Sequence, residues 1–274
     1  MIRKFFIFFL ILSCDFKDFY IFGVFPSQKE LVSSDEIEEF AQKLSKELKK
    51  PVRVYVGKDY EDVIKRMKAG IITFSFVPAL SYTEISDNYD MVLKFVRNGK
   101  TFYRGQVIVL NEINDISQLK KKNWAFPDKK STSGYILPLY LFYKLGIDVD
   151  TFFDYKYEAG SHDKAVELLL RGNVQVATTF EDVRERLKDI YPDIFQKTKI
   201  LYYTDSIPND GFAINKKLSK RERENIIRAI KKLIKEDSVL FYKWFGSYTL
   251  TDAKNSDYDI LKEILRSVSD KISK

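Results

Sequence analysis

The chain has 274 residues, with 46 lysines and arginines, 39 aspartates and glutamates, one histidine and one cysteine. Its 45% apolar and 15% aromatic residues suit a globular protein of one large or two modest domains, which excludes intrinsic disorder. A lone cysteine excludes an intrachain disulfide framework, and a lone histidine excludes a metal site built from several histidines. The formal charge of +7 is spread along the chain beside acidic residues, so it does not indicate a nucleic-acid-binding surface.

The first fourteen residues predict a signal peptide that ends at the only cysteine. Arg3 and Lys4 precede an apolar run from Phe5 to Leu12, which is shorter than the roughly 20 residues of a membrane-spanning helix. The run ends in Ile-Leu-Ser-Cys, which resembles a bacterial lipobox, so we expect Cys14 to be lipidated. An uncleaved apolar N-terminus or a buried first strand is the alternative. Removal of the leader would lower the formal charge to +5.

From Tyr20 onward, β-type segments alternate with amphipathic helical patterns. Ser33 followed by Glu36 is typical of a capping box that opens a helix, and Gly70 is a stop signal for the second helix. The predicted strands cover residues 20–25, 52–56, 71–76, 102–110, 124–126 and 174–178, and the later helices cover 59–69, 134–145 and 164–170. This alternation predicts an α/β fold whose parallel or mixed sheets carry helices on both faces.

The last third of the chain changes from alternation to helix. Residues 202–206 and 211–215 are the last predicted strands, and the chain is predicted to be helical from Ser219, where Glu222 completes a second capping box. One face of this helix is rich in lysine and arginine. That pattern is typical of a solvated surface, with a nucleic-acid or lipid-headgroup surface as the alternative.

The segment Ser131-Thr132-Ser133-Gly134 lies between the strand at 124–126 and the next predicted helix. Hydroxyls and backbone N–H groups at a helix N-terminus form a cradle for an anion, because unsatisfied donors and the positive end of the helix dipole point the same way. An ordinary helix cap is the alternative. The segment lacks the Gly-Lys-Ser/Thr ending of a P-loop, which excludes that type of nucleotide site.

His162 precedes another helical pattern, where its ring could donate a hydrogen bond to an oxyanion, or could simply be a partly exposed polar group. The chain has no Gly-x-Ser-x-Gly motif, so Ser131 or Ser133 with His162 is a poor nucleophile and base pair. Nothing in the sequence singles out a carboxylate pair for hydrolysis. We therefore expect a protein that is not an enzyme and that needs no cofactor.

Five segments together resemble the phosphonate-, phosphite- and phosphate-binding subunits of ABC importers. They are YIFGVFPSQ at 20–28, KDYEDVIKRMKAGIITFSF at 58–76, KSTSGYILPLY at 130–140, AGSHDKAVELLLRGNVQVAT at 159–178 and SIPNDGFAI at 206–214. The resemblance implies the type II periplasmic-binding-protein fold, two α/β lobes with mixed sheets, joined by two hinge segments and holding the ligand in the cleft between them. The crossings would fall near 103–107 and 203–207. Lobe 1 would comprise residues 18–104 with 206–274, and lobe 2 residues 105–205.

The resemblance also assigns ligand-binding roles. Ser131, Thr132 and Ser133 would hold the phosphonyl oxygens, and His162 would add a donor from the same lobe. Each hydrogen bond to a charged oxygen contributes about 1.5–3 kcal/mol, so roughly five neutral donors could offset an association cost of about 4–15 kcal/mol. Donors fixed in direction select a tetrahedral oxyanion with one corner that makes no hydrogen bond.

The other assigned residues would shape the rest of the pocket. Tyr60 and Tyr103 match tyrosines that close over the ligand. Asp210 and, with a one-residue gap in the alignment, Glu181 match carboxylates that face a ligand amine or hydroxyl, which favours an amine-bearing or protonated ligand over phosphate dianion. Val77-Pro78 stands where many members of the family have an aromatic-Gly pair, so this pocket wall departs from the pattern.

The sequence therefore predicts an exported, lipid-anchored substrate-binding protein, located in the periplasm or on the outer face of the cytoplasmic membrane. It would capture a phosphonate, phosphite or phosphate and deliver it to an ABC permease. We expect a monomer that contacts the membrane through its anchor and binds neither nucleic acid nor metal. The alternatives are a clamshell that presents its ligand to a membrane receptor or sensor kinase and, more distantly, a phosphoester hydrolase.

Overall fold

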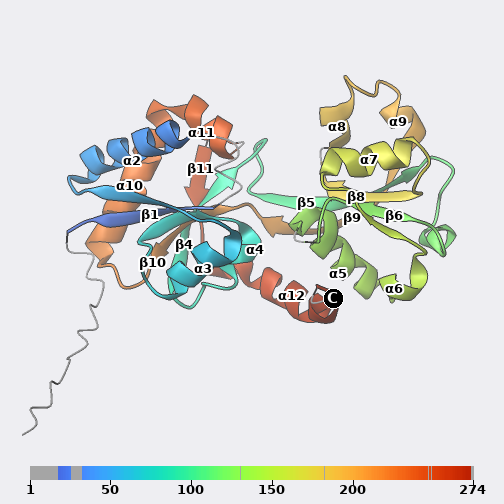
Figure 1. Cartoon of the computed structure of the whole chain (residues 1–274), viewed down its shortest axis with the longest axis horizontal. Helices are drawn as coiled ribbons and strands as arrows, with labels where there is room; N and C mark the ends of the chain where they lie inside the picture. The colour runs from blue at the N-terminus through green and yellow to red at the C-terminus, as the bar shows by residue number, and fades with distance from the viewer. Residues whose placement is uncertain are drawn as a thin grey trace, which may run out of the picture. The chain divides into compact units, whose positions relative to one another are not determined.

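The computed structural model describes residues 18–25, 33–129, 131–181, 183–245, 247 and 249–272, so the predicted signal peptide and Cys14 lie outside the described residues. The chain divides into two compact units, each with its own mixed sheet (Figure 1). Among the described residues, unit 1 contains those within 18–77, 84–95 and 210–253, and unit 2 contains those within 78–83, 96–209 and 254–272. The α/β class with two mixed sheets is confirmed. None of the helices in the described ranges is long and apolar enough to cross a membrane.

The sheet of unit 1 has the strand order β11-β4-β10-β3-β1-β2, in which β1 runs parallel to β2 and β3, while β10 is antiparallel to β3 and β4. Its strands are β1 (Tyr20–Val24), β2 (Val52–Val56), β3 (Phe74–Val77), β4 (Tyr89–Val96), β10 (Gly211–Asn215) and β11 (Thr249–Asp252). Its helices are α2 (Ser34–Leu48), α3 (Tyr60–Lys68), α10 (Lys220–Glu236) and α11 (Ser238–Phe245).

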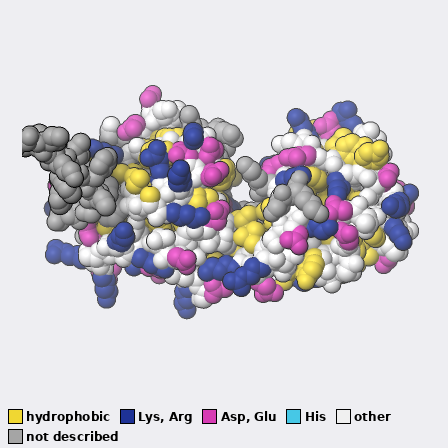
Figure 2. All heavy atoms as spheres, turned by 60° about the horizontal axis from the view of Figure 1, so that its bottom comes forward, with side chains coloured by type: hydrophobic (Ala, Val, Ile, Leu, Met, Phe, Trp, Pro, Cys, Tyr) yellow, Lys and Arg dark blue, Asp and Glu magenta, His cyan; other side chains and the backbone are white. Residues whose placement is uncertain are grey.

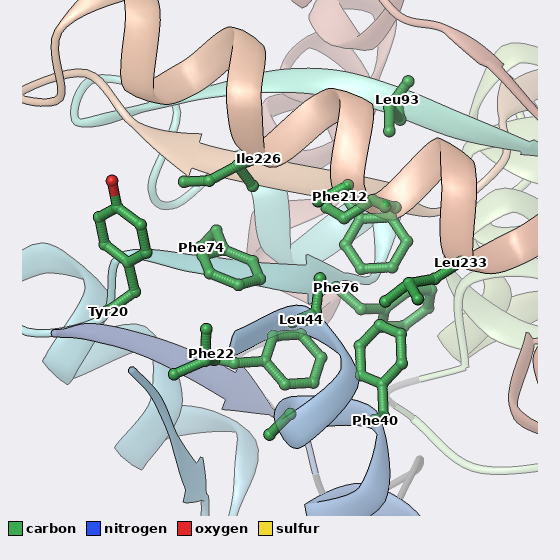
Figure 3. Packing of buried hydrophobic residues seen from close by; sticks show 14 of the residues in the cluster. Tyr20, Phe22, Phe40, Leu44, Phe74, Phe76, Leu93, Phe212, Ile226 and Leu233 are labelled. Atoms are coloured by element: carbon green, nitrogen blue, oxygen red, sulfur yellow. The ribbon is translucent and has the colours of Figure 1, made fainter. Parts of the chain in front are cut away.

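The core of unit 1 forms where α2 and α10 pack their apolar stripes against the sheet. Phe22 of β1 contacts Phe40 of α2 edge-on and stacks with Phe74 of β3, with ring centroids 5.4 Å and 5.3 Å apart, respectively (Figure 3). Both predicted capping boxes are confirmed at the starts of these helices. The Glu36 N–H donates to the Ser33 hydroxyl, and the Ser33 N–H donates to the Glu36 carboxylate at 2.8 Å.

The sheet of unit 2 has the order β7-β6-β8-β5-β9, with β6 parallel to β7 and β8, and β5 antiparallel to β8 and β9. Its strands are β5 (Phe102–Leu110), β6 (Trp124–Phe126), β7 (Lys156–Glu158), β8 (Val176–Phe180) and β9 (Thr198–Pro208). Its helices and helical turns are α4 (Ala79–Tyr82), η1 (Ile116–Leu119), η2 (Thr132–Ile136), α5 (Leu137–Lys144), α6 (Val149–Phe152), α7 (His162–Leu170), α8 (Val183–Leu187), α9 (Ile194–Lys197), η3 (Asn255–Tyr258) and α12 (Asp259–Ile272).

Two layers of helices enclose the sheet of unit 2, with α7 on one face and α5 on the other (Figure 1). On the α7 side, Val166 and Leu169 pack with Ile108 of β5 in a fully buried cluster. On the α5 side, Trp124 of β6 contacts Phe142 edge-on at a centroid distance of 5.4 Å. These buried contacts hold the segments that follow β6, β7 and β8, where all the predicted ligand-binding residues of this unit except Tyr103 lie.

The chain after Ser219 is not helical throughout, which corrects the prediction for the last third. Residues 249–252 form β11 at the edge of the unit 1 sheet, beside β4. The strand is short, its residues are exposed or half-buried, and it lacks the apolar run that would signal it in the sequence. Just before this strand, the Ser247 hydroxyl donates to the carbonyl of Thr249 and accepts from its N–H.

The division into units differs from the predicted lobes at the C-terminus. Residues 254–274 group with unit 2, whereas the sequence assigns them to lobe 1. The physical reason is that α12 packs on α5, where the Tyr140 hydroxyl donates to Glu263 at 2.9 Å and Lys271 pairs with Asp148 and Asp150, both at 2.6 Å. The chain changes unit at 95/96 and 209/210, whereas the predicted crossings near 103–107 and 203–207 fall inside unit 2, on the paired strands β5 and β9.

Charges of both signs are interspersed on the protein surface. On the face shown in Figure 2, lysine and arginine side chains alternate with aspartate and glutamate. On the basic face of α10, Lys231 pairs with Asp252 and Lys232 with Glu47, both at 2.6 Å. The net positive charge is therefore partly compensated locally, as in a solvated surface.

Candidate anion-binding site

Three segments that carry predicted ligand-binding residues follow three neighbouring parallel strands of unit 2. Residues 131–133 follow β6, His162 follows β7 and Glu181 follows β8. The carboxyl ends of parallel strands meet at one edge of a sheet, which is where α/β proteins place their ligand sites. The topology thus brings these residues to one edge of unit 2.

Ser131 caps a wide helical turn that leads into α5. Its hydroxyl accepts from the Gly134 N–H at 3.1 Å, and its carbonyl accepts from the N–H groups of Tyr135 and Ile136 at 3.0 and 3.1 Å. The second of these is the i to i+5 bond of a π turn, a local form frequent at functional sites. Residues 132 and 133 precede the first intrahelical bond, so helical geometry leaves their N–H groups available to an anion.

Two glycines allow the backbone to pack closely around this turn. A Cβ on Gly105 of β5 would lie 2.3 Å from the carbonyl oxygen of Ser133, and a Cβ on Gly134 would lie 2.4 Å from Cδ of Pro127. Both distances are far below van der Waals contact. Glycine is therefore required at these two positions if the turn at residues 131–136, called the hydroxyl turn below, is to pack against β5.

A buried hydrogen-bond chain fixes the turn from the opposite side. The Trp124 indole N–H donates to the Thr178 hydroxyl at 2.8 Å, and that hydroxyl donates to the carbonyl of Gly134. The Trp124 ring also stacks on Tyr135 with an interplanar angle of 10° and a centroid distance of 5.6 Å. Because every group in this series of hydrogen bonds is buried, the turn has little freedom to change its shape.

His162, the first residue of α7, lies next to the turn. Its Nε2 is 3.5 Å from the Ser131 hydroxyl oxygen, and its Nδ1 accepts a hydrogen bond from the Phe180 N–H at 3.4 Å. The Phe180 ring packs edge-on against the imidazole at 4.9 Å. Because Nδ1 acts as an acceptor, the proton of the neutral ring belongs on Nε2, which is therefore a donor at the site.

The surroundings of His162 keep its ring neutral. Burial lowers its pKa to about 4, and the charge of Arg186 acts in the same direction, while Asp128 and Asp163 oppose it. At neutral pH the site therefore offers hydroxyls, backbone N–H groups and one uncharged imidazole N–H beside two helix N-termini. With Nδ1 engaged by a backbone N–H and Nε2 protonated, His162 is arranged to donate a hydrogen bond and not to abstract a proton from Ser131.

A set of neutral donors at two helix N-termini is suited to an oxyanion. The comparisons with known proteins show the family to which the chain belongs. A family model described as ABC transporter, phosphonate, periplasmic substrate-binding protein matches residues 22–258. The chain belongs to this family. The resemblance expected from the sequence motifs is confirmed.

Relatives of this phosphonate-transporter family support the assignment. The phosphonates-binding periplasmic protein of Escherichia coli K12 is 25% identical over 217 residues, which cover 75% of this chain and 63% of the relative. The matched region therefore spans less than two thirds of that protein's length.

Solved structures of similar proteins confirm the periplasmic-binding-protein fold. PhnD1 of Prochlorococcus marinus, solved in complex with methylphosphonate, has a TM-score of 0.66 at 19% identity and covers 92% of this chain and 98% of its own. A Xanthomonas citri protein bound to ATP has a TM-score of 0.73 at 14% identity and covers 93% of this chain and 98% of its own. At these identities the likeness concerns the fold alone.

Glu181 is engaged by two cations that the sequence did not indicate. Its carboxylate pairs with Lys100 at 3.0 Å and with Arg104 at 3.1 Å. Burial would raise the pKa of the Glu181 carboxyl, but the hydrogen bonds from both cations outweigh this and hold the pKa below its usual value. Arg104 and Glu181 are 77 positions apart, so only the pairing of β5 with β8 reveals the contact.

The remaining predicted residues lie on other elements. Tyr103 is half-buried on β5, opposite Ile207 of β9. Tyr60 and Asp210 belong to unit 1. Tyr60 starts α3 after β2, and its ring lies 5.4 Å from that of Phe25, which directly follows β1. Asp210 precedes β10, whose first residue pairs with Val77 at the end of β3. Both residues therefore lie at the carboxyl edge of the parallel strands of unit 1.

Proposed function

We propose that this protein is an extracytoplasmic solute-binding protein that captures a phosphonate or phosphite and delivers it to an ABC permease. The observation that supports this best is the donor set around Ser131 and His162, which matches a tetrahedral oxyanion in charge and geometry. In this proposal the role is non-enzymatic, and the protonated Nε2 of His162 gives Ser131 no general base. Tyr60, Tyr103 and Asp210 remain predicted ligand contacts.

The predicted contact with Asp210 favours phosphite and phosphonates over phosphate dianion. Each neutral donor stabilises a charged oxygen by about 1.5–3 kcal/mol, without supplying a full positive charge. Asp210 is a predicted ligand contact, and its negative charge would oppose a second negative charge on the ligand. Phosphate is therefore the weakest member of the proposed ligand set.

Calorimetry of the purified protein tests the proposal. Methylphosphonate, 2-aminoethylphosphonate, phosphite, phosphate and sulfate should be titrated under the same conditions. At least one phosphonate or phosphite should bind with a Kd below about 1 mM, which corresponds to roughly 4 kcal/mol. If none of these anions binds more tightly than that, the proposed function is wrong.

Ser133→Ala gives the residue-specific arm of this test. The change removes one donor to a charged oxygen and should weaken binding by about 1.5–3 kcal/mol. The variant should lose little free energy of unfolding, since the backbone of the turn is unchanged and the alanine side chain is smaller than that of serine. Unchanged affinity in a folded Ser133→Ala protein would show that the ligand binds elsewhere.

Export and lipid anchoring complete the proposal, supported by the leader and the Ile-Leu-Ser-Cys segment that ends at Cys14. In a bacterial host, the wild-type protein should then fractionate with membranes and be released by detergent. Cys14→Ser should abolish the lipid attachment and should move the protein out of the detergent-extracted fraction. Equal membrane retention of both proteins would argue against the anchor.

A further inference from the structure

Three charged side chains form a cluster at the carboxyl end of β8, the strand whose last residue, Phe180, contacts His162 of the anion cradle (Ser131, Thr132, Ser133 and His162). Glu181 is largely buried, with 15% of its side chain exposed, and Oε1 contacts both Lys100 Nζ at 3.0 Å and Arg104 Nη2 at 3.1 Å. The side chains of Arg104 and Lys100 are 34% and 55% exposed. This cluster of Lys100, Arg104 and Glu181 carries one positive charge in excess.

The pairing of β5 with β8 places the cluster next to the cradle. Gly105 pairs with Phe180, and the same two residues approach the cradle, Gly105 at the carbonyl of Ser133 and Phe180 at the ring of His162. Arg104 and Glu181 are the next residues on either side, toward the carboxyl end of β8. The cluster therefore lies one residue beyond the backbone groups that support the oxyanion donors.

The cluster is held in place by more than its ion pairs. The Glu181 N–H donates to the carbonyl of Arg104 at 3.1 Å, so backbone and side chain bind the same partner. The guanidinium of Arg104 also lies over the ring of Tyr203, 3.6 Å from its centroid. A carboxylate neutralised in this way attracts a further cation weakly, and the two cations that hold it repel one.

We infer that the Lys100, Arg104 and Glu181 cluster makes the site discriminate against ligands whose substituent carries a cationic amine, so that the substrate is an uncharged alkylphosphonate or phosphite. This inference rests on the proposed function. It reverses the expectation from the sequence that Glu181 favours an amine, and it leaves Asp210 to face a ligand hydroxyl, the other partner predicted for that carboxylate. The Glu181 carboxylate is present, but its charge is already compensated within the protein.

Two ligands of equal size test the inference by calorimetry. Propylphosphonate and 2-aminoethylphosphonate have the same number of heavy atoms, and a terminal methyl group in one replaces the ammonium in the other. The wild-type protein should bind propylphosphonate about tenfold more tightly, because one excess positive charge near the substituent penalises only the amine.

Variants of the two cations should reduce this preference. Lys100→Gln, Arg104→Gln and the double variant remove positive charge and release Glu181, so affinity for 2-aminoethylphosphonate should rise relative to propylphosphonate, most in the double variant. Arg171→Gln is the matched control. It breaks the pair with Glu167 at the other end of α7 from His162 and should leave the ratio unchanged.

Each outcome has a distinct meaning. Equal or tighter binding of 2-aminoethylphosphonate to the wild type would overturn the inference, as would an unchanged ratio in the folded double variant. If methylphosphonate binds and neither longer ligand does, pocket size and not the cluster excludes the amine, and the inference is again wrong. If no phosphonate or phosphite binds, both the inference and the proposed function are wrong. The largely exposed Lys100 side chain makes Lys100→Gln usable even if Arg104→Gln fails to fold.

Discussion

At the scale of single residues, His162 shows how neighbours decide what a side chain can do. The sequence indicates a polar residue at a helix start, which is compatible with a solvated ring, an oxyanion donor or a base. The Phe180 N–H selects the tautomer by donating to Nδ1, and burial selects the neutral form by lowering the pKa to about 4. Neither effect is visible in the sequence, because Phe180 reaches His162 only through the packing of β8 against the start of α7.

The same shift gives His162 a measurable effect on stability. The unfolded chain protonates this ring near its ordinary pKa of about 6.5, whereas the folded protein resists protonation down to about 4. The unfolded state therefore binds more protons in this window, and the contribution of His162, complete above pH 6.5, falls as the pH decreases through it. Between pH 7 and pH 4.5 the loss should be about 2–3 kcal/mol.

Urea unfolding of the wild type and of His162→Gln at pH 7, 5.5 and 4.5 measures this effect. Glutamine does not titrate, so the stability of the variant should decline less over the same interval. Other groups titrate equally in both proteins, and the difference between the two curves isolates the histidine. Parallel curves would show that the folded and unfolded states protonate His162 alike.

At the scale of elements, much of the architecture follows from local sequence signals. The strands at 52–56, 102–110, 124–126 and 211–215 were predictable to the residue, because apolar β-prone segments there are bounded by turns or charged stretches. Both capping boxes were predictable because they are local. The strand β11 was not, since its four residues bury little, and the pairing that joins Arg104 to Glu181 was not, since register is decided by tertiary packing.

The close approach of β5 to the hydroxyl turn predicts the effect of Gly105→Ala. The new Cβ would lie 2.3 Å from a backbone oxygen, which cannot rotate away, so β5 and the turn must separate. The protein should lose about 1–3 kcal/mol of unfolding free energy, and ligand affinity should fall because the Ser133 donors move. Chemical unfolding and calorimetry measure the two effects.

Gly172→Ala is a control that separates the cost of backbone strain from the effect of displacing the turn that carries Ser133. Gly172 follows α7 at a φ of +75° with no atom within 4 Å of an added Cβ, so alanine there costs backbone strain alone. This control should lose about 1 kcal/mol of stability with no change in affinity. Equal affinities of Gly105→Ala and the wild type would mean that the turn tolerates the displacement.

At the scale of the whole molecule, the two units have separate cores, but the chain passes between them more than twice. It leaves unit 1 for residues 78–83, leaves again after residue 95, returns at residue 210 and leaves once more after residue 253, so that α12 completes unit 2. The sequence could not assign α12 to a unit, because its apolar stripe fits any complementary helix. Its partner, α5, is distant in sequence, and the Tyr140–Glu263 and Lys271 contacts form only on folding.

The placement of α12 in unit 2 predicts which part of the protein a substitution in α12 destabilises. Ile264 is fully buried, and Ile264→Ala should cost about 2–5 kcal/mol by leaving a cavity beneath α12. Hydrogen exchange should then rise in α5 and α12, while the strands β1 and β3 of unit 1 keep their protection. Ile230→Ala in α10 is the matched control, because Ile230 is equally buried in the unit 1 core and should produce the converse pattern. Increased exchange in β1 and β3 upon Ile264→Ala would mean that α12 stabilises unit 1, as the sequence-based lobe boundaries assume.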